Sequence, residues 1–376
     1  MKQGIFAYLQ PKKGILKRIL LTVTNDLRYD QRMERICSAL AAEGYRVTLI
    51  GRKGSHAPPL AHRPYRQVRL RCFIPSGPLF YIEYNLRLFF KLLILKSDCI
   101  VAIDLDTILP CLFVSKLKKS KRVYDAHELF CEMKEVVTRP SRYRLWKAIE
   151  EFAVPRFQHG YTVNEPIAAE FAKMYGSQYA VIRNLPFQRQ RKAISGKKEY
   201  ILYQGAVNEG RSFETLIPAM QYVKLPLWIC GDGNYMAQCK TLVQQYGLSE
   251  KVLFKGRVTP EALWEITQEA YMGITLFENK GKSNYLSLAN RFFDYIQAGI
   301  PQLCVNYPAY LSVLEKYQVA LPIEDLSPNT IADALNLLIS DGVLYARLAN
   351  QCKQAALEYN WTEEEKKLIA FYHALL

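Results

Sequence analysis

Short apolar strands alternate with amphipathic helices twice along this chain, and no other feature constrains the fold as much. Residues 17–24 (KRILLTVT) form an apolar run with β-branched side chains, typical of a buried strand. Residues 30–44 place apolar side chains at helical spacing and end on Gly44, and residues 46–50 (RVTLI) predict a second strand. A strand, a helix and a strand in close succession predict a βαβ unit and therefore a parallel sheet.

The same alternation continues to residue 182 and begins again at residue 200. Further strands are predicted at residues 99–103, 122–124, 158–163 and 179–182, and then at 200–204, 227–230, 252–255, 273–277 and 301–305. Further helices are predicted at residues 107–117, 141–153, 166–174, 213–220, 235–246, 260–269 and 290–298.

A polar and basic stretch separates the two series. Residues 186–199 (PFQRQRKAISGKKE) show no periodicity, which is typical of a linker. We therefore predict an α/β protein with two Rossmann-like doubly wound domains, over residues 1–185 and 200–358.

The net charge of +15 lies entirely in the first half of the chain. Residues 1–190 contain 32 Lys and Arg against 16 Asp and Glu, whereas the remainder contains 18 against 19. A basic half can face nucleic acid, an anionic membrane or a phosphorylated substrate, or it can be a basic surface without a specific partner. No nucleic-acid recognition motif accompanies the charge, so we do not expect a nucleic-acid partner.

The cysteines and the apolar stretches indicate a cytoplasmic protein. An odd count of nine cysteines without a CxxC pair is typical of reduced thiols and argues against a zinc site. The N-terminal residues show no secretory signal. Charged residues interrupt the most apolar stretch, residues 86–103, so we predict no transmembrane helix.

Two loops in the second half carry candidate ligand-binding residues. Gly205 ends a strand, Asn208 lies in the loop, and Arg211 stands just before a helix, where backbone N–H groups and a guanidinium attract phosphate. The alternative is an ordinary loop with a surface arginine. Gly231 and Gly233 follow the next strand, where glycines let a ligand approach the backbone or form a tight turn.

A third loop leads into the helix predicted at residues 290–298. Ser287 or Asn290 is a candidate N-cap, and Asp294 falls one turn after Asn290 on the same face. The helix start can hold an anion while Asp294 accepts hydrogen bonds from a polyol such as ribose. The alternative is a capped helix with a solvated aspartate.

Ionisable residues also follow strands in the first half. Asp125, His127 and Glu128 come directly after a strand, at the carboxyl end where such sheets bind ligands. His127 can donate a hydrogen bond to a substrate hydroxyl or a sugar oxygen, or it can be structural. Asp104 and Asp106 follow another strand, and we interpret them as loop structure and not as metal ligands.

The loop after the first strand contains Asp26, Arg28 and Asp30 but no glycine. A dinucleotide bound at this place needs the pattern GxGxxG, so the loop argues against a dehydrogenase. Asp30 is a candidate N-cap of the helix that follows.

Residues 80–96 (FYIEYNLRLFFKLLILK) combine an apolar helical face with intervening cations, and four arginines precede them between residues 63 and 71. Such a segment can lie on an anionic membrane surface, so residues 63–96 are the candidate contact of a peripheral membrane protein. The alternative is a core helix whose cations extend to the solvent.

Taken together, these segments resemble the GT-B glycosyltransferases of family 4 (glycosyl transferases group 1). The resemblance spans nearly the whole chain and is carried by DQRM at 30–33, GYRV at 44–47, DLDT at 104–107, YDAHELF at 124–130, RNLP at 183–186, YQGAVNEGR at 203–211, GDG at 231–233, FKGRV at 254–258 and SLANRFFDYIQAGIP at 287–301.

The resemblance implies two Rossmann-like domains that face each other across a cleft. Residues 1–185 would bind the acceptor and residues 200–358 a nucleotide-sugar donor, while residues 359–376 resemble a terminal helix that returns to the first domain. The implied reaction is retaining and needs neither a metal nor a cofactor.

The resemblance also implies roles for individual residues. Arg211 would contact the donor diphosphate, Asp294 the ribose and His127 the transferred sugar, and we predict these three as catalytic. The other donor-side candidates are Gly205, Asn208, Gly231, Gly233, Tyr285, Ser287, Leu288 and Asn290. The acceptor-side candidates are Asp26, Arg28, Asp30, Asp125 and Glu128.

Three positions depart from the family pattern. Leu286 stands where the first of two paired glutamates would fall, Asp294 shortens the second, and Ala206 replaces a basic residue that often follows the loop glycine.

The predicted activity is transfer of a hexose to a lipid-linked or phosphorylated glycan in surface polysaccharide assembly. A non-catalytic membrane-associated subunit and a GT-B sugar-nucleotide epimerase are the alternatives.

Overall fold

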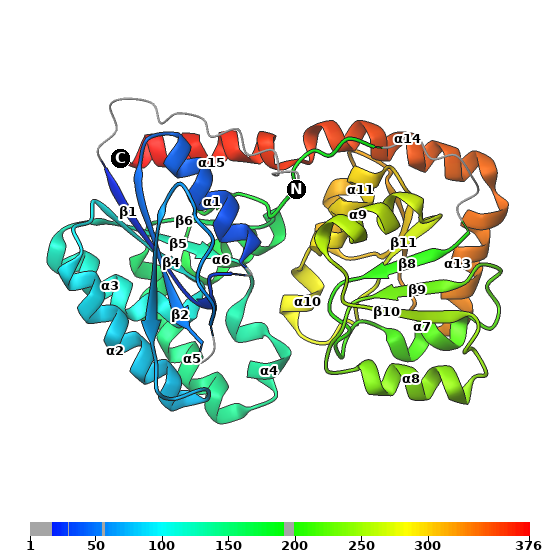
Figure 1. Ribbon diagram of the computed structural model, residues 1–376, viewed down its shortest axis with the longest axis horizontal. Coiled ribbons are helices and arrows are strands. Elements are labelled where there is room, and N and C mark those ends of the chain that lie inside the picture. Colours follow the sequence, from blue (N-terminus) through cyan, green and yellow to red (C-terminus); the bar gives the residue numbers. More distant parts are fainter. Residues whose placement is uncertain (1–16, 29, 55–56, 192–198) are drawn as a thin grey trace. The chain divides into compact units, whose positions relative to one another are not determined.

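The computed structural model describes residues 17–28, 30–54, 57–191 and 199–376 (Figure 1). The chain divides into two compact units. The N-terminal unit ends at Arg183 and includes Glu364–Leu376, and the C-terminal unit is Asn184–Glu363. All nine cysteines are free thiols, and eight of them are buried.

The N-terminal unit contains a seven-stranded parallel sheet in the order β3-β2-β1-β4-β5-β6-β7, with helices on both faces (Figure 1). Its strands are β1 (Arg18–Asp26), β2 (Arg46–Lys53), β3 (Arg66–Arg71), β4 (Cys99–Ile103), β5 (Lys121–Ala126), β6 (His159–Thr162) and β7 (Ala180–Val181). Its helices are α1 (Gln31–Ala42), α2 (Pro78–Ile94), α3 (Ile108–Lys118), α4 (Lys134–Val137), α5 (Pro140–Ala153) and α6 (Glu165–Tyr175), with 3-10 turns η1 (Leu105–Thr107), η2 (Phe130–Glu132) and η3 (Val154–Arg156).

The C-terminal unit contains a six-stranded parallel sheet in the order β10-β9-β8-β11-β12-β13. Its strands are β8 (Ile201–Gln204), β9 (Leu227–Cys230), β10 (Val252–Gly256), β11 (Met272–Thr275), β12 (Gln302–Val305) and β13 (Ala320–Ile323). Its helices are α7 (Phe213–Ala219), α8 (Met236–Gln245), α9 (Pro260–Glu269), α10 (Lys282–Leu286), α11 (Asn290–Ala298), α12 (Pro308–Leu314), α13 (Pro328–Ser340) and α14 (Gly342–Glu358).

These two sheets confirm the prediction of two Rossmann-like doubly wound α/β folds. In each sheet the strand order reverses beside the first strand, between β1 and β4 and between β8 and β11. The sequence analysis did not predict β3, α4, α10, α12, β13, α13 and α14. The edge strand β3 (RQVRLR) is largely charged and only half-buried, so it lacks the apolar run of a central strand. The five-residue helix α10 is too short to show a period.

Side-chain packing attaches α11 firmly to strand β8. Phe292, Phe293 and Ile296 are buried in the main core of the C-terminal unit. On another face of the helix, the buried Tyr295 donates a hydrogen bond from its hydroxyl to the carbonyl oxygen of Leu202 in β8, at 2.9 Å. The polar residues of α11 therefore occupy set positions relative to the end of β8.

The last helix, α15 (Trp361–Leu375), contributes buried side chains to the N-terminal unit from Glu364 onwards. Leu368 and Tyr372 are fully buried, and the Tyr372 ring lies 6.4 Å from that of Tyr161, between centroids. His373 Nε2 lies 3.2 Å from Glu43 Oε1 of the loop after α1. The N-terminal unit is therefore completed by residues that follow the whole C-terminal unit in the sequence.

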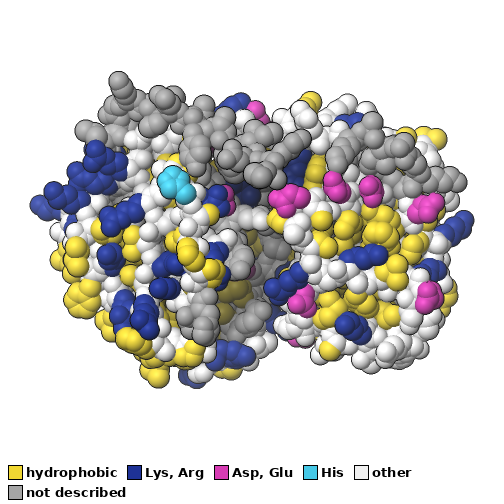
Figure 2. Space-filling model, viewed as in Figure 1, with side chains coloured by type: hydrophobic (Ala, Val, Ile, Leu, Met, Phe, Trp, Pro, Cys, Tyr) yellow, Lys and Arg dark blue, Asp and Glu magenta, His cyan; other side chains and the backbone are white. Residues whose placement is uncertain are grey.

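The surface reflects the uneven charge of the chain. In Figure 2, Lys and Arg side chains predominate on the visible face of the N-terminal unit, whereas Asp and Glu are more frequent on the C-terminal unit. None of the helices in the described ranges combines the length and the apolar character that a bilayer crossing requires.

Candidate functional site

His127 lies at the carboxyl edge of the first sheet, between two aspartates. Its Nδ1 is 3.3 Å from Asp104 Oδ2, and its Nε2 is 3.3 Å from Asp125 Oδ2. Its backbone N–H donates a 2.9 Å hydrogen bond to Asp104 Oδ1. Asp104 follows β4 with a φ of 55°, a value that is uncommon for a residue with a Cβ. Asp104 therefore holds both the backbone and the ring of His127, a role that the sequence interpretation as simple loop structure missed.

A buried arginine completes this cluster from α1. Arg32 Nη2 lies 2.9 Å from Asp125 Oδ1, and Nη1 donates to the carbonyl oxygen of Ile182. Both Arg32 and Asp125 are almost fully buried. The sequence analysis did not select Arg32, because its partner lies 93 residues away and nothing in the helical pattern distinguishes it from a surface arginine.

The cluster keeps His127 charged. Burial by itself lowers the His127 pKa, but the nearby carboxylates of Asp104 and Asp125 outweigh burial and raise the pKa to about 10. His127 Nε2 makes no hydrogen bond within the described chain, although the Asp125 carboxylate is close. At neutral pH the buried Nε2–H therefore faces the Asp125 carboxylate, and the imidazole is a positive charge held at the edge of the sheet.

The remaining acceptor-side candidates have mainly local roles. Asp26 pairs with Arg28, whose Nη2 lies 2.9 Å from Asp26 Oδ2 and whose hydrogen bond lowers the Asp26 pKa. Asp30 accepts a 3.0 Å hydrogen bond from the backbone N–H of Met33, which confirms it as the N-cap of α1. Glu128 is half-buried beside His127.

The loops after β8 and β9 of the C-terminal unit interlock. The backbone N–H of Gly205 donates to the carbonyl oxygen of Cys230, and that of Val207 donates to Asp232. Asn208 Oδ1 accepts a 3.2 Å hydrogen bond from the backbone N–H of Asn234, so this candidate residue holds one loop against the other.

The glycines of the second loop are needed for this close approach. A Cβ at Gly231 would lie 1.8 Å from the carbonyl oxygen of Gly205, and one at Gly233 would lie 2.3 Å from that of Val207. The absent side chains leave room for the loop after β8, so the backbone that these glycines allow to approach belongs to the protein itself. Gly205 is different, because it is exposed and a Cβ there would contact only the guanidinium of Arg291, at 3.4 Å.

Arg211 lies against a residue that follows β11, and Asp294 lies at the end of β8. The Arg211 guanidinium carbon is 4.2 Å from the centre of the Phe277 ring. Asp294 accepts a 3.0 Å hydrogen bond from Gln204 Nε2, the last residue of β8. Gln204 in turn accepts a 2.7 Å hydrogen bond from the hydroxyl of Thr267. The structure thus places a cation and an anchored carboxylate near the carboxyl ends of two neighbouring strands, β11 and β8.

The predicted N-caps of α11 are wrong. The N-cap position is Ala289, which has no capping side chain. Ser287 donates from its hydroxyl to the carbonyl oxygen of Asn284, and Asn290 accepts a hydrogen bond from Asn184 Nδ2. The short helix α10 ends directly before Ser287 and turns its hydroxyl back onto α10, which the sequence pattern could not reveal.

The backbone around this helix start is partly occupied. The N–H of Ser287 donates to Asn284, and that of Ala289 donates to the Tyr310 hydroxyl. Tyr285 packs its ring 5.0 Å from that of Tyr307, between centroids, and Leu288 packs against the core.

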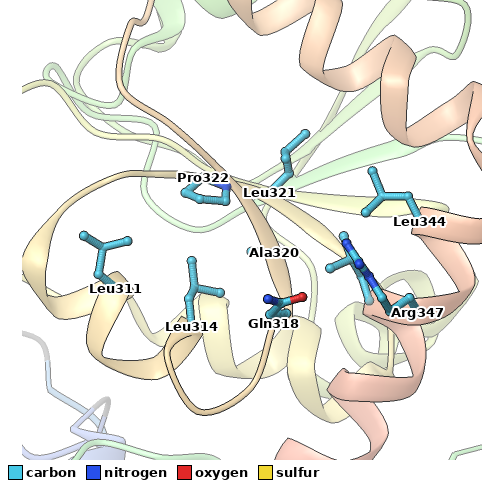
Figure 3. A pocket seen from close by; sticks show the side chains of 9 residues that line it. Leu311, Leu314, Gln318, Ala320, Leu321, Pro322, Leu344 and Arg347 are labelled. Atoms are coloured by element: carbon cyan, nitrogen blue, oxygen red, sulfur yellow. The ribbon is translucent and has the colours of Figure 1, made fainter.

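The described residues include no cluster of metal ligands, and a pocket among them lies apart from the candidate residues. No group of three or more His, Cys, Asp and Glu side chains within the described ranges is placed to hold a metal ion. A pocket of about 260 Å³ lies between α12, β13 and α14, lined mostly by leucines with Arg347 at its side (Figure 3). None of the candidate residues lines this pocket.

Two protein-family models match adjacent parts of the chain. Residues 31–185 match the family model "Glycosyltransferase Family 4", and residues 185–358 match "Glycosyl transferases group 1". The chain belongs to the family 4 glycosyltransferases with a GT-B fold. The resemblance inferred from the sequence motifs is confirmed. No curated protein sequence matches the chain.

Solved structures agree with the GT-B fold of this glycosyltransferase. A sucrose-phosphate synthase from Thermosynechococcus elongatus is 18% identical, with a TM-score of 0.76 over 96% of this chain and 99% of the other. The Anabaena protein HepE, solved with UDP and glucose, is 12% identical, with a TM-score of 0.75 over 96% and 100%. WaaG, a glycosyltransferase involved in lipopolysaccharide biosynthesis, is 15% identical, with a TM-score of 0.72 over 94% and 99%.

The charge of His127 in this glycosyltransferase is directly testable. Because its pKa is raised, His127 should contribute stability that is complete below pH 6.5 and is lost as the pH rises through about 10. An NMR titration should show His127 protonated well above pH 7, whereas burial lowers the pKa of His159. Asp104→Asn should lower the His127 pKa by about 1 to 3. The spectrum of His127→Asn assigns the signal, and a wild-type pKa near 6.5 would contradict the cluster.

The close contact between the loops after β8 and β9 predicts that alanine lowers stability at Gly231 but not at a glycine outside these loops. Gly231→Ala should lower the free energy of unfolding by about 1–3 kcal/mol, because its Cβ overlaps the carbonyl oxygen of Gly205. Gly342→Ala is the control, since a Cβ there meets nothing within 4 Å. Urea denaturation of both variants measures the difference. Equal stability of the two would show that the loops separate at little cost.

Proposed function

We propose that this glycosyltransferase moves a hexose from a nucleotide-sugar donor to a lipid-linked or phosphorylated glycan in surface polysaccharide assembly. The reaction would retain the anomeric configuration and need no metal ion. HepE was solved with UDP and glucose, and WaaG acts in lipopolysaccharide biosynthesis, which supports a sugar nucleotide as donor and a surface glycan as product. The C-terminal unit would bind the donor and the N-terminal unit the acceptor.

One observation carries the donor half of the proposal. Arg211 stacks on Phe277 near the carboxyl edge of the second sheet, where α11 also presents Asp294, hydrogen-bonded to Gln204 at the end of β8. A guanidinium fits a phosphate oxygen pair, and a carboxylate fits the vicinal hydroxyls of a ribose. These two kinds of group are those that the two polar parts of a nucleoside diphosphate require.

Electrostatic stabilisation of the leaving group would then provide catalysis. As the bond between the sugar and the diphosphate breaks, negative charge develops on the diphosphate, and a preorganised guanidinium such as that of Arg211 stabilises this charge. His127, held charged by Asp104 and Asp125, would place its positive charge beside the transferred sugar. The departing phosphate would accept the proton of the attacking hydroxyl on the same face of the sugar.

The acceptor half of the proposal rests on α2. Ile82, Leu86, Phe90 and Ile94 recur every four residues and are each more than half exposed, while Phe80, Tyr84, Leu88 and Leu92 form a separate buried face. Helix α2, which carries this exposed stripe, contacts the basic edge strand β3, and Lys91 is on the same helix. Apolar side chains flanked by cations suit the surface of an anionic membrane, where a lipid-linked acceptor resides.

The donor site can be tested without knowing the sugar. Thermal unfolding should be measured with UDP, GDP and ADP and with their hexose conjugates. A ligand at a hundred times its Kd adds about 2.7 kcal/mol to the free energy of unfolding, which raises Tm. One nucleotide class should give this shift, and Arg211→Ala should remove most of it, whereas Arg347→Ala on α14 should keep it. The absence of any shift in folded wild type would favour the non-catalytic subunit.

The proposed membrane contact predicts that substitutions on α2 weaken vesicle binding. Wild type should float with vesicles of phosphatidylglycerol and phosphatidylcholine at low salt, and less with phosphatidylcholine alone. Ile82→Asp combined with Phe90→Asp should weaken vesicle binding at least about tenfold, because two apolar anchors are lost. Val343→Asp, at another exposed apolar residue, is the control. Equal flotation of wild type and the double variant would contradict the contact.

A further inference from the structure

Arg291 is a buried cation in the C-terminal unit that the sequence analysis passed over. Only 8% of the residue is exposed, although it is the second residue of α11. Its guanidinium carbon lies 4.6 Å from the centre of the Tyr203 ring and 4.7 Å from that of Phe277. Nη1 lies 3.4 Å from the Tyr203 hydroxyl, a long hydrogen bond, and within the described chain Nε and Nη2 have no hydrogen-bond partner.

No carboxylate within the described ranges pairs with this guanidinium. A buried charge is normally paired, because removing an ion from water is costly. The two aromatic faces offset part of that cost, and they leave Nε and Nη2 unsatisfied. Arginine keeps its charge at every pH at which proteins fold, so it cannot escape the cost by releasing a proton. An anion that enters beside Arg291 would satisfy both the charge and the two donors.

The surroundings of Arg291 point to the same ligand site as Arg211. Both guanidinium groups lie against the Phe277 ring, at 4.2 Å and 4.7 Å from its centre. Both also act on the buried Tyr310 hydroxyl, where their positive charges oppose the rise of its pKa that burial causes. Two cations that share one aromatic ring favour a ligand with two negative groups over one with a single charge.

The guanidinium of Arg291 also lies near the place of a basic side chain that this chain lacks. Ala206 stands where the family resemblance leads us to expect a basic residue, directly after Gly205. The Tyr203 hydroxyl donates a 2.7 Å hydrogen bond to the carbonyl oxygen of Ala206 and lies next to Arg291 Nη1. A Cβ at Gly205 would be 3.4 Å from that same nitrogen. The guanidinium of Arg291 thus lies beside the loop from which a basic side chain at residue 206 would project.

We propose that Arg291 is a second cation of the donor site, which binds the diphosphate together with Arg211 in place of a basic residue at position 206. This assignment rests on the proposed nucleotide-sugar function. Each arginine would bind one phosphate, with Nε and Nη2 of Arg291 forming a fork that matches two oxygens of the same group. Nucleoside affinity should then depend little on Arg291, and affinity for the diphosphate strongly.

Calorimetric titration separates these contributions. The probes are inorganic pyrophosphate, which has no base, the diphosphates UDP, GDP and ADP, and their parent nucleosides. Arg291→Met, which keeps the length of the side chain without its charge, should weaken pyrophosphate and diphosphate binding at least about tenfold. It should leave nucleoside binding unchanged and should not lower Tm without ligand, since an unpaired buried charge is removed. Arg347→Met is the matched control, and Arg291→Lys should retain part of the affinity.

Each outcome decides the proposal. Loss of diphosphate affinity in Arg291→Met with unchanged nucleoside affinity supports it, and recovery in Arg291→Met with Ala206→Arg adds to that support. If wild type binds diphosphates and Arg211→Ala loses them while Arg291→Met does not, Arg291 is no donor residue and the proposed function stands. A lower Tm of Arg291→Met with unchanged affinity marks Arg291 as structural and overturns the proposal. If folded wild type binds no diphosphate, both proposals fail.

Discussion

In both units every strand runs parallel to its neighbours, so every strand leads into its next helix at the same edge of the sheet. This constraint gathers residues that are far apart in the sequence. At the first edge it brings Asp104, after β4, next to His127, which directly follows β5, and near Asp125 at the carboxyl end of that strand. At the second edge it brings the loop after β8 against the loop after β9. Neither site would exist if the strands alternated in direction, because half of these loops would then lie at the opposite edge.

The buried charges at the two sheet edges differ in whether they are paired. At the first, two aspartates and Arg32 surround His127, so each charge has a partner and the imidazole stays protonated. At the second, Arg291 is buried against aromatic rings without a carboxylate partner. A charge balanced by protein neighbours stays in place without a ligand, whereas an unbalanced one is ready to bind an anion. The difference matches the proposed roles towards the sugar and the diphosphate.

Local signals in the sequence were reliable where local physics decides the outcome. The cap at Asp30 depends only on the N–H group three residues later, and the sequence predicted it. The predicted caps at Ser287 and Asn290 failed because a short helix directly before α11 turned the Ser287 hydroxyl away. The partners of His127 and the burial of Arg291 depend on contacts across the fold, for which a single sequence carries no periodic signal.

The sequence by itself determined the alternation of most strands and helices up to residue 305, the two doubly wound sheets and the loops that carry polar residues, because hydrophobic period and turn residues act over a few positions. Only the tertiary structure decided which of these residues meet. In the tertiary structure Asp104 accepts a hydrogen bond from the backbone N–H of His127, and Gly231 lies against the carbonyl oxygen of Gly205. Such assignments depend on distances between segments, which are set when the sheets assemble and not by any one segment.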